Sequence, residues 1–244
     1  MTVSGYDRFA GLYSRHWAGF SARIMPTLER ILLAGLPKRA GILDLCCGAG
    51  HLAAHLAARG FRVTGIDKSA AMIEQARLNA PRATFEAGDV QEVALRPGAF
   101  DAATCLFDSL NHMMTMTELQ AVFTIVHLAL RPSGRFVFDL NTHEGYLERW
   151  RGEIHIVEDD CVCMVKARYD AITRIGRNDV TMFERDGAWR RTDLTMEQKC
   201  HETQEVLAAL ASAGFCGVAT YDARQDFGLS NAEGRLFFRC EKPA

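Results

Sequence analysis

Residues 41–56 constrain the fold of this 244-residue chain more than any other stretch. An apolar segment over residues 42–45 predicts a short buried strand. Gly48 and Gly50 follow, and glycine readily accepts the positive φ angles and the close backbone approach of a tight turn. Apolar residues then recur at helical spacing. A strand, a glycine turn and a helix point free backbone N–H groups at a ligand, so we expect a binding site here.

Two classes of cofactor fit this turn. Gly48, Gly50 and Ala53 match the loose glycine pattern of dinucleotide binding. Asp67 follows at the end of the next expected strand, where a carboxylate can accept hydrogen bonds from ribose hydroxyls. Enzymes that use a nicotinamide and enzymes that use S-adenosylmethionine share these features, so this pattern leaves both classes open.

Asp44 favours the second class, because a carboxylate inside a strand is costly unless it has a partner. The cationic amino group of S-adenosylmethionine is such a partner, whereas a pyrophosphate would be repelled. The segment DLCCGAG, residues 44–50, resembles motif I of the class I S-adenosylmethionine-dependent methyltransferases, with Cys46 in place of the first glycine. The resemblance implies that S-adenosylmethionine is the cofactor and that motif I binds it through Asp44, Cys46, Gly48 and Gly50.

Three later segments extend the resemblance. Residues 61–67, 83–89 and 100–106 predict further strands, and their exits match the family's cofactor contacts. The resemblance assigns to the cofactor site the residues Asp67, Lys68, Met72, Asp89, Val90, Leu106 and Phe107. Residues 6–13 resemble the lead-in helix of small-molecule methyltransferases, which covers the cleft and adds Tyr6 and Tyr13 to the site. A helix that docks its aromatic side chains on the sheet explains the same segment.

The period of the sequence changes near residue 153, where apolar and polar residues begin to alternate as in antiparallel strands. We expect an inserted β cap at residues 151–202, and a cofactor-binding domain formed by residues 1–150 and 203–244 with an N-terminal helical lid. The predicted fold is α/β: a Rossmann-like, seven-stranded, mostly parallel sheet with an antiparallel last strand, plus this small antiparallel β cap. The cap resembles an insertion in the same methyltransferase subgroup.

The composition of the chain limits which partners and which cellular compartment we expect. The net charge of −2 gives no basic footprint for nucleic acid. The eight cysteines lack the paired spacing of zinc sites, so we expect free thiols and no metal. No secretory signal and no apolar run of about 18 residues is visible. We therefore expect a cytoplasmic protein with a small-molecule acceptor and no membrane partner, and the cap offers a surface for a homodimer.

Three residues are candidates for catalysis. His112 lies in the exit of the fourth expected strand, a segment that resembles the C-x-D-S-L-N-Y exit of the same subgroup and adjoins the transferred methyl. His201 ends the run EQKCH, at the position where the subgroup's H-x-Q-R-x-Y motif has tyrosine. Either histidine can serve as a general base, and either also fits a structural role. Tyr13 is expected to close the pocket over the substrate.

The predicted function is the transfer of a methyl group from S-adenosylmethionine to a nitrogen or oxygen of a small molecule. Because the sulfonium is already activated, such an enzyme mainly positions the two reactants. A nicotinamide-dependent oxidoreductase and a non-catalytic protein that binds S-adenosylmethionine remain as alternatives. The former would more naturally continue in parallel βαβ units, which the alternating segment interrupts.

Overall fold

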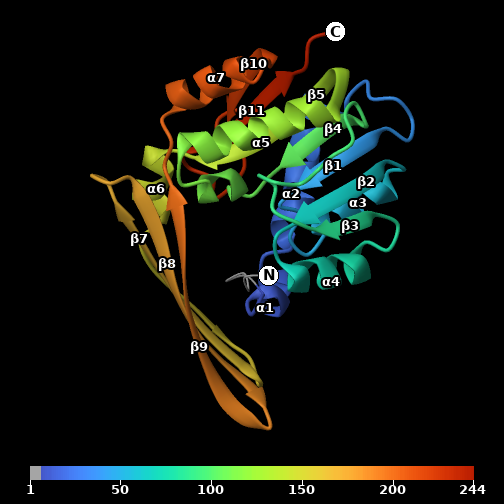
Figure 1. Cartoon of the computed structure of the whole chain (residues 1–244). Coiled ribbons are helices and arrows are strands. Elements are labelled where there is room, and N and C mark those ends of the chain that lie inside the picture. The colour runs from blue at the N-terminus through green and yellow to red at the C-terminus, as the bar shows by residue number, and fades with distance from the viewer. Residues whose placement is uncertain (1–6) are drawn as a thin grey trace.

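A computed structural model of the protein describes residues 7–244, and its core is a seven-stranded sheet in the order β10-β11-β5-β4-β1-β2-β3 (Figure 1). All neighbouring strands are parallel except β11, which is antiparallel to both β5 and β10. The fold class predicted from the sequence is therefore confirmed. The strands are β1 (Gly41–Leu45), β2 (Arg62–Asp67), β3 (Thr84–Ala87), β4 (Phe100–Cys105), β5 (Leu130–Asn141), β10 (Cys216–Asp222) and β11 (Arg235–Glu241).

Helices cover both faces of this sheet. One face packs against α5 (Met116–Ala129) and α7 (Thr203–Ser212), and the other against α2 (Gly19–Leu28), η1 (Glu29–Leu33), α3 (His51–Ala58) and α4 (Ala70–Asn79). Ile42 and Leu43 on β1 illustrate the alternation, because consecutive side chains of a strand enter opposite cores. The remaining helical segments are α1 (Ala10–His16), η2 (Ser109–His112) and α6 (His143–Arg149).

Two local expectations need correction. The sequence predicts one helix over residues 21–33, ended by Gly35 and Pro37, but the α-helix ends at Leu28 and continues as the π-helical turn η1. The segment RPSG, residues 131–134, predicts a turn, but these residues belong to β5, where Ser133 has a φ of 62°. The register with β4 shifts between Phe100 and Ala102 beside this irregularity. β5 therefore has more residues than β4 between these two pairs, and they form a local irregularity within the strand.

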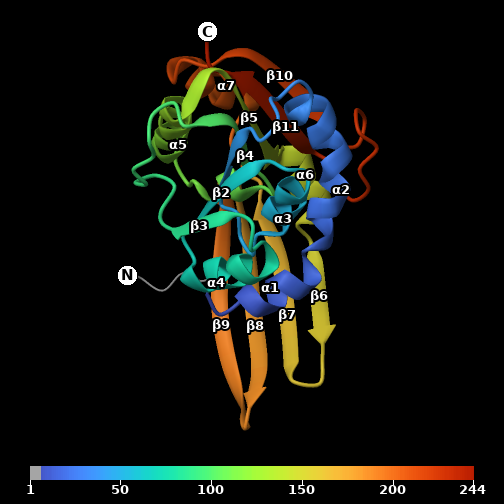
Figure 2. The same ribbon diagram turned by 90° about the vertical axis from the view of Figure 1, so that its right-hand side faces the viewer.

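A second sheet of four antiparallel strands stands across the carboxyl edge of the core sheet (Figures 1 and 2). It contains β6 (Gly152–Val157), β7 (Cys161–Asp170), β8 (Ile175–Asp186) and β9 (Ala188–Lys199). We call this sheet the cap. Its β8–β9 hairpin extends well beyond the rest of the molecule. Helix α1 lies between the cap and the core, and its Phe9 and Leu12 pack against Cys163, Val180 and Met182 of the cap. The cap therefore encloses a space beside α1.

No helix within residues 7–244 combines the length and the apolar character needed to cross a membrane. All eight cysteines are free thiols, as the sequence predicts. Cys46 and Cys47 extend the apolar segment of residues 42–45 in the sequence, which predicts that they lie in the same buried strand. They lie instead half-buried in the turn after β1.

Candidate functional site

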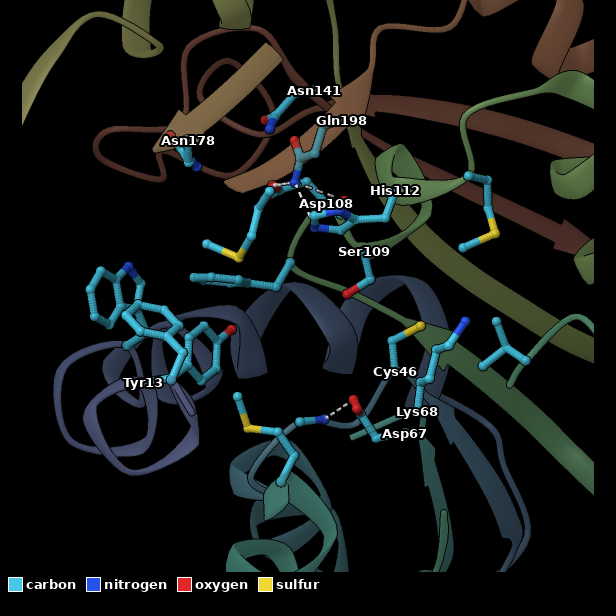
Figure 3. A pocket seen from close by; sticks show the side chains of 18 of the residues that line it. Tyr13, Cys46, Asp67, Lys68, Asp108, Ser109, His112, Asn141, Asn178 and Gln198 are labelled. Carbon is cyan, nitrogen blue, oxygen red and sulfur yellow. Dashed lines mark hydrogen bonds between the residues drawn. The ribbon is translucent and has the colours of Figure 1, made fainter. Parts of the chain in front are cut away.

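A cavity of about 590 Å³ lies between the core and the cap. The segments that follow β1, β2, β3 and β4 line it, together with Asn141 at the end of β5. Ligands of open α/β sheets bind at this edge, where the carboxyl ends of parallel strands meet. The cap closes the other side with residues that include Val165, and Figure 3 shows Asn178 and Gln198 on this side. We call the side formed by the segments after β1, β2 and β3 the core wall. The opposite side, formed by the cap together with the exit of β4 and Asn141, is the cap wall.

The turn after β1 forms the middle of the core wall through an unusual backbone. Cys46, Gly48 and Gly50 have φ angles of 52°, 52° and 75°, in the left-handed region that glycine favours. Cys46 and Gly48 line the cavity, whereas Gly50 does not. A Cβ on Gly50 would lie 2.8 Å from the Cβ of Ala76. Gly50 is therefore needed for close packing of α3 on α4, not for contact with a ligand.

Asp67 is fixed beside this turn by two backbone N–H groups. Gly48 N–H donates to its Oδ2 at 2.9 Å, and Ser69 N–H donates to its Oδ1 at 2.9 Å. Each carboxylate oxygen keeps a further lone pair, and the side chain lines the cavity (Figure 3). Burial raises the pKa of Asp67, and the two N–H bonds oppose this shift. The geometry suits hydrogen bonds from two neighbouring hydroxyls of a ribose.

Apolar and charged groups continue the core wall from there. Met72 and Val90 are buried, and both line the cavity. Lys68 donates to Asp89 Oδ2 at 2.7 Å, while Gln91 N–H donates to Asp89 Oδ1 at 3.0 Å. The Lys68 ammonium and the Gln91 N–H lower the pKa of Asp89, although burial opposes them. These residues form a slot with an apolar floor and a charged end, which fits a flat base such as adenine.

Asp44 lies in a small annex of about 70 Å³ next to the main cavity. Its Oδ1 accepts a hydrogen bond from Thr104 Oγ1 at 2.7 Å, but its buried Oδ2 has no partner among the described residues. Burial raises the pKa of Asp44 to about 7, and Asp67 adds to the rise. An orphaned carboxylate oxygen of this kind calls for a cationic partner. The amino group of S-adenosylmethionine meets that need, so the core wall fits the cofactor.

Aromatic rings from α1 and from the exit of β4 meet between the cavity and the annex. Tyr13 stacks on Trp17 with ring centroids 5.8 Å apart and meets Phe107 edge-on at 6.0 Å. All three rings line both spaces, whereas Leu106 lines only the annex. Tyr6 lies outside the residues that the structure describes. Aromatic faces attract cations, so this cluster suits a sulfonium or a methylated ammonium.

A buried ion cluster supports the cap wall. Arg235 donates to both Asp108 and Asp139, with a distance of 2.5 Å to Asp108. Asp139 also accepts the N–H groups of Phe107 at 2.6 Å and Asp108 at 3.0 Å. These two residues have φ angles of 68° and 50°, a conformation costly for residues with a Cβ. The cluster therefore holds a strained strand exit in place at the cavity.

Gln198 of the cap links this cluster to His112. Its Nε2 lies 2.7 Å from Asp108 Oδ2 and 3.3 Å from His112 Nε2, and its Oε1 accepts from the Tyr146 hydroxyl at 2.7 Å. His112 Nδ1 lies 2.8 Å from the carbonyl oxygen of Glu197. A carbonyl only accepts, so Nδ1 carries the proton and Nε2 keeps its lone pair. Burial lowers the pKa of His112 despite the charge of Asp108, so the ring is neutral near pH 7.

His201 does not take part in this arrangement. Its Nε2 donates to the carbonyl oxygen of Met113 at 2.7 Å, and its ring lines a separate cavity with His143. His201 therefore lies outside the cavity in which the other candidate residues meet. The last residue of the run bends back into the core because β9 ends at Lys199. Gln198, three residues earlier in the same run, faces the main cavity instead.

The cavity contains polar residues that the sequence analysis did not single out. They come from six separate elements or their ends: Asp108, Asn141, Arg149, Asn178, Gln198 and Arg235. The subgroup's H-x-Q-R-x-Y pattern has glutamine at the position of Gln198, so this motif could have identified Gln198 from the sequence. Arg235 carries no local signal, because its burial depends on carboxylates that lie 96 and 127 residues away in the chain.

Comparisons with known proteins agree with this geometry. Residues 42–134 match a family model described as a methyltransferase domain. YqeM of Bacillus subtilis (strain 168), a protein named as a methyltransferase, is 30% identical over 216 residues, which cover 86% of this chain and 87% of YqeM. A second relative, from Saccharopolyspora spinosa, is named dTDP-4-amino-2,3,4,6-tetradeoxy-D-glucose N,N-dimethyltransferase. It is 28% identical over 195 residues, which cover 73% of this chain and 76% of the relative.

A solved structure shares the fold over nearly the whole chain. CalS10 from Micromonospora echinaspora, described as an amino pentose methyltransferase with bound S-adenosylmethionine, superposes with a TM-score of 0.72. The match covers 99% of each chain at 22% sequence identity. The similarity thus includes the cap as well as the core sheet.

Proposed function

Since this chain belongs to the class I S-adenosylmethionine-dependent methyltransferases, we propose that it methylates an amine nitrogen of a small polar acceptor. The observation that supports this most is the cavity itself. One wall fits the cofactor, and the facing wall presents carboxylate, amide and aromatic groups. Such a wall suits a small molecule that has both hydrogen-bonding groups and an amine.

The cofactor is assigned to the core wall. Asp67 would bind the ribose hydroxyls, and Asp44 the amino group. Met72, Asp89 and Val90 would surround the adenine. This arrangement leaves the sulfonium beside Tyr13 and Phe107, whose rings favour a cation.

The choice of nitrogen follows from the charge of the product. Methylation of an amine leaves a cation in the cavity until a proton departs. The carboxylate of Asp108 and the rings of Tyr13 and Trp17 line the same space, and both kinds of group stabilise positive charge. The names of the Saccharopolyspora relative and of CalS10 both refer to amino sugars, which supports an acceptor of this class.

S-adenosylmethionine supplies an activated methyl group when it is bound. The residues of the two walls would hold the acceptor nitrogen against that methyl group, and the sulfur would leave as S-adenosylhomocysteine when the nitrogen takes the methyl group. His112 would accept the proton through Nε2 after the amide of Gln198 moves away. Positioning by the two walls supplies most of the rate enhancement, because an oriented pair of reactants avoids most of the entropic cost.

A hydroxyl acceptor is the second candidate. Its proton must leave during the reaction, and the low pKa of His112 keeps a neutral base available for that step. The family assignment does not favour an oxidoreductase that uses a nicotinamide. A non-catalytic protein that binds S-adenosylmethionine would release no S-adenosylhomocysteine with any acceptor.

The test is a panel of amine and hydroxyl acceptors, including amino sugars and the matching neutral sugars. Release of S-adenosylhomocysteine and the mass of the product are measured for each. Turnover of the amines with none of the neutral sugars supports the proposal. Turnover of the hydroxyl acceptors alone would show that the methylated atom is oxygen and not nitrogen. Binding of S-adenosylmethionine without turnover of any acceptor would contradict the proposal that the protein is an enzyme.

Self-association through the cap also remains a proposal. Val157 and Trp189 lie towards the end of the cap where β6 turns into β7 and β8 turns into β9, and they expose 77% and 49% of their surface. Apolar groups of this kind can contribute to an interface between two copies. Light scattering of the intact protein and of Val157→Asp would test it, because a dimer formed there should dissociate in the variant.

A further inference from the structure

A side pocket of about 150 Å³ opens beside the large cavity. It shares Phe107, Arg149 and Arg235 with the large cavity, so the two spaces adjoin. Arg23 of α2 completes a set of three arginines, and among the described residues no carboxylate lines this pocket. A molecule held in the large cavity can therefore extend one group into a strongly basic space.

The nearest carboxylates already have cationic partners. Asp108 and Asp139 both pair with Arg235, and Glu233 pairs with Arg224 at 2.8 Å. The guanidinium carbon of Arg235 also lies 5.2 Å from the ring centre of Phe20 and 5.7 Å from that of Phe107. The charge of Arg235 is thus compensated by two carboxylates.

Arg149 and Arg23 are different. Arg149 donates to the carbonyl oxygen of Glu233 at 2.9 Å and to the amide oxygen of Asn141, which are both neutral groups. Within residues 7–244 neither Arg149 nor Arg23 forms an ion pair with a carboxylate. Burial and the nearby Arg235 lower the pKa of Arg149, although the charges of Asp108, Asp139 and Glu233 oppose this shift.

Asn141 adds an independent observation. Its side chain lines the large cavity, it is only 1% exposed, and its Nδ2 has no hydrogen-bond partner among the described residues. Its Oδ1 is taken by Arg149, so only the donor end remains. A buried N–H without an acceptor is costly, and an oxygen of a ligand would satisfy it.

From this geometry we propose that the acceptor carries an oxyanion, a phosphate or a carboxylate, which binds between Arg149 and Arg23 in the side pocket. Asn141 then donates to the part of the acceptor next to that group. Guanidinium groups suit this role because their planar N–H groups match the oxygens of both anions. The inference rests on the proposed function, since it places the acceptor in the large cavity.

Calorimetric titration at low ionic strength tests the side pocket without any turnover. The probes are inorganic pyrophosphate and malonate, which stand for phosphate and carboxylate. The variants are Arg149→Gln and the exposed Arg23→Gln. Arg82→Gln is the matched control, because Arg82 is exposed and lines none of the described cavities. We expect one probe to bind the intact protein, at least ten-fold weaker binding by each pocket variant, and unchanged binding by the control.

Preference for pyrophosphate assigns a phosphorylated acceptor, and preference for malonate assigns an acceptor that is a carboxylic acid. Absence of binding by either probe overturns the proposal, as does equal weakening in Arg82→Gln. Displacement of the probe by S-adenosylmethionine also overturns it, because the pocket would then hold the carboxylate of the cofactor. The probes carry no amine, so their binding does not depend on which atom of the acceptor is methylated. The side pocket can therefore be tested even if the acceptor proves not to be an amine.

Discussion

The core wall and the cap wall of the cavity hold their polar groups by different means. On the core wall, backbone N–H groups of Gly48 and Ser69 fix Asp67, and both lie within 19 residues of it in the chain. On the cap wall, side chains fix other side chains. Asp108 is held by Gln198 and Arg235, which lie 90 and 127 residues away.

The two walls therefore form under different conditions. The core wall forms whenever β1 and β2 pair and the glycine turn closes, so cofactor binding depends on local backbone geometry. The cap wall forms only after the cap, the exit of β4 and β11 have all come together. Damage to the cap wall should therefore alter stability and acceptor turnover, whereas damage to the core wall should alter cofactor affinity.

The largest expected effect comes from Arg235→Met. The substitution leaves the carboxylates of Asp108 and Asp139 buried without a counter-ion, and breaking a buried pair in this way costs about 3 to 5 kcal/mol. Urea unfolding measures the loss. Arg224→Met is the control, because Arg224 forms an exposed ion pair with Glu233 worth less than about 1 kcal/mol. Equal losses in the two variants would show that the cluster does not support the cap wall.

His112→Ala should reduce turnover about 100-fold, at the lower end of the usual contribution of a general base. Affinity for S-adenosylmethionine should remain unchanged. Only neutral His112 can accept a proton, so the rate should fall as pH drops through its pKa, which burial places below 6.5. The variant should lose this acidic limb. His143→Ala, in the separate cavity, is the control, and a variant that retains both its rate and its pH profile would exclude His112 as the base.

Asp67→Ala should weaken binding of S-adenosylmethionine by about 1.5 to 3 kcal/mol, because hydrogen bonds to a charged group are lost. Calorimetry measures the affinity, and thermal unfolding confirms that the variant is folded. Glu86→Ala is the matched control, since Glu86 lies on exposed β3 surface outside the cavity. Unchanged affinity in a folded Asp67→Ala protein would remove Asp67 from the cofactor site.

The smallest effect concerns Asp44 and pH. The folded pKa of about 7 lies above the ordinary value of 3.8, so the free protein holds this proton more tightly than the unfolded chain. Stability from this group should fall as pH rises from 3.8 towards 7. The cationic amino group favours ionised Asp44, so affinity for S-adenosylmethionine should rise roughly ten-fold between about pH 6 and 8. Calorimetry in two buffers should detect the released proton, and a flat pH profile in wild type would contradict the assignment.

The sequence allowed most of the core sheet and the core wall to be predicted, because short-range patterns specify them. The glycine turn, Asp67 and the apolar periods each report structure within a few residues. The residues of the cap wall were harder to predict from the sequence. Arg235 resembles an ordinary surface arginine near a turn until Asp108 and Asp139 surround it. His201 matched a motif position, but the end of β9 turned it away from the cavity. Which polar side chain becomes buried is decided by packing between distant segments.

The position of β11 has a consequence for the order in which the molecule is completed during synthesis. β11 follows every other strand in the chain, yet it lies between β10 and β5 inside the sheet. Until it leaves the ribosome, β5 has an open edge and the two carboxylates near it have no guanidinium partner. At that stage the nascent chain already contains the whole glycine turn, but β10 is not yet joined to β5 and the rest of the sheet. β11 is translated after the other six strands of this sheet, so its addition closes both the sheet and the charge cluster in a single step.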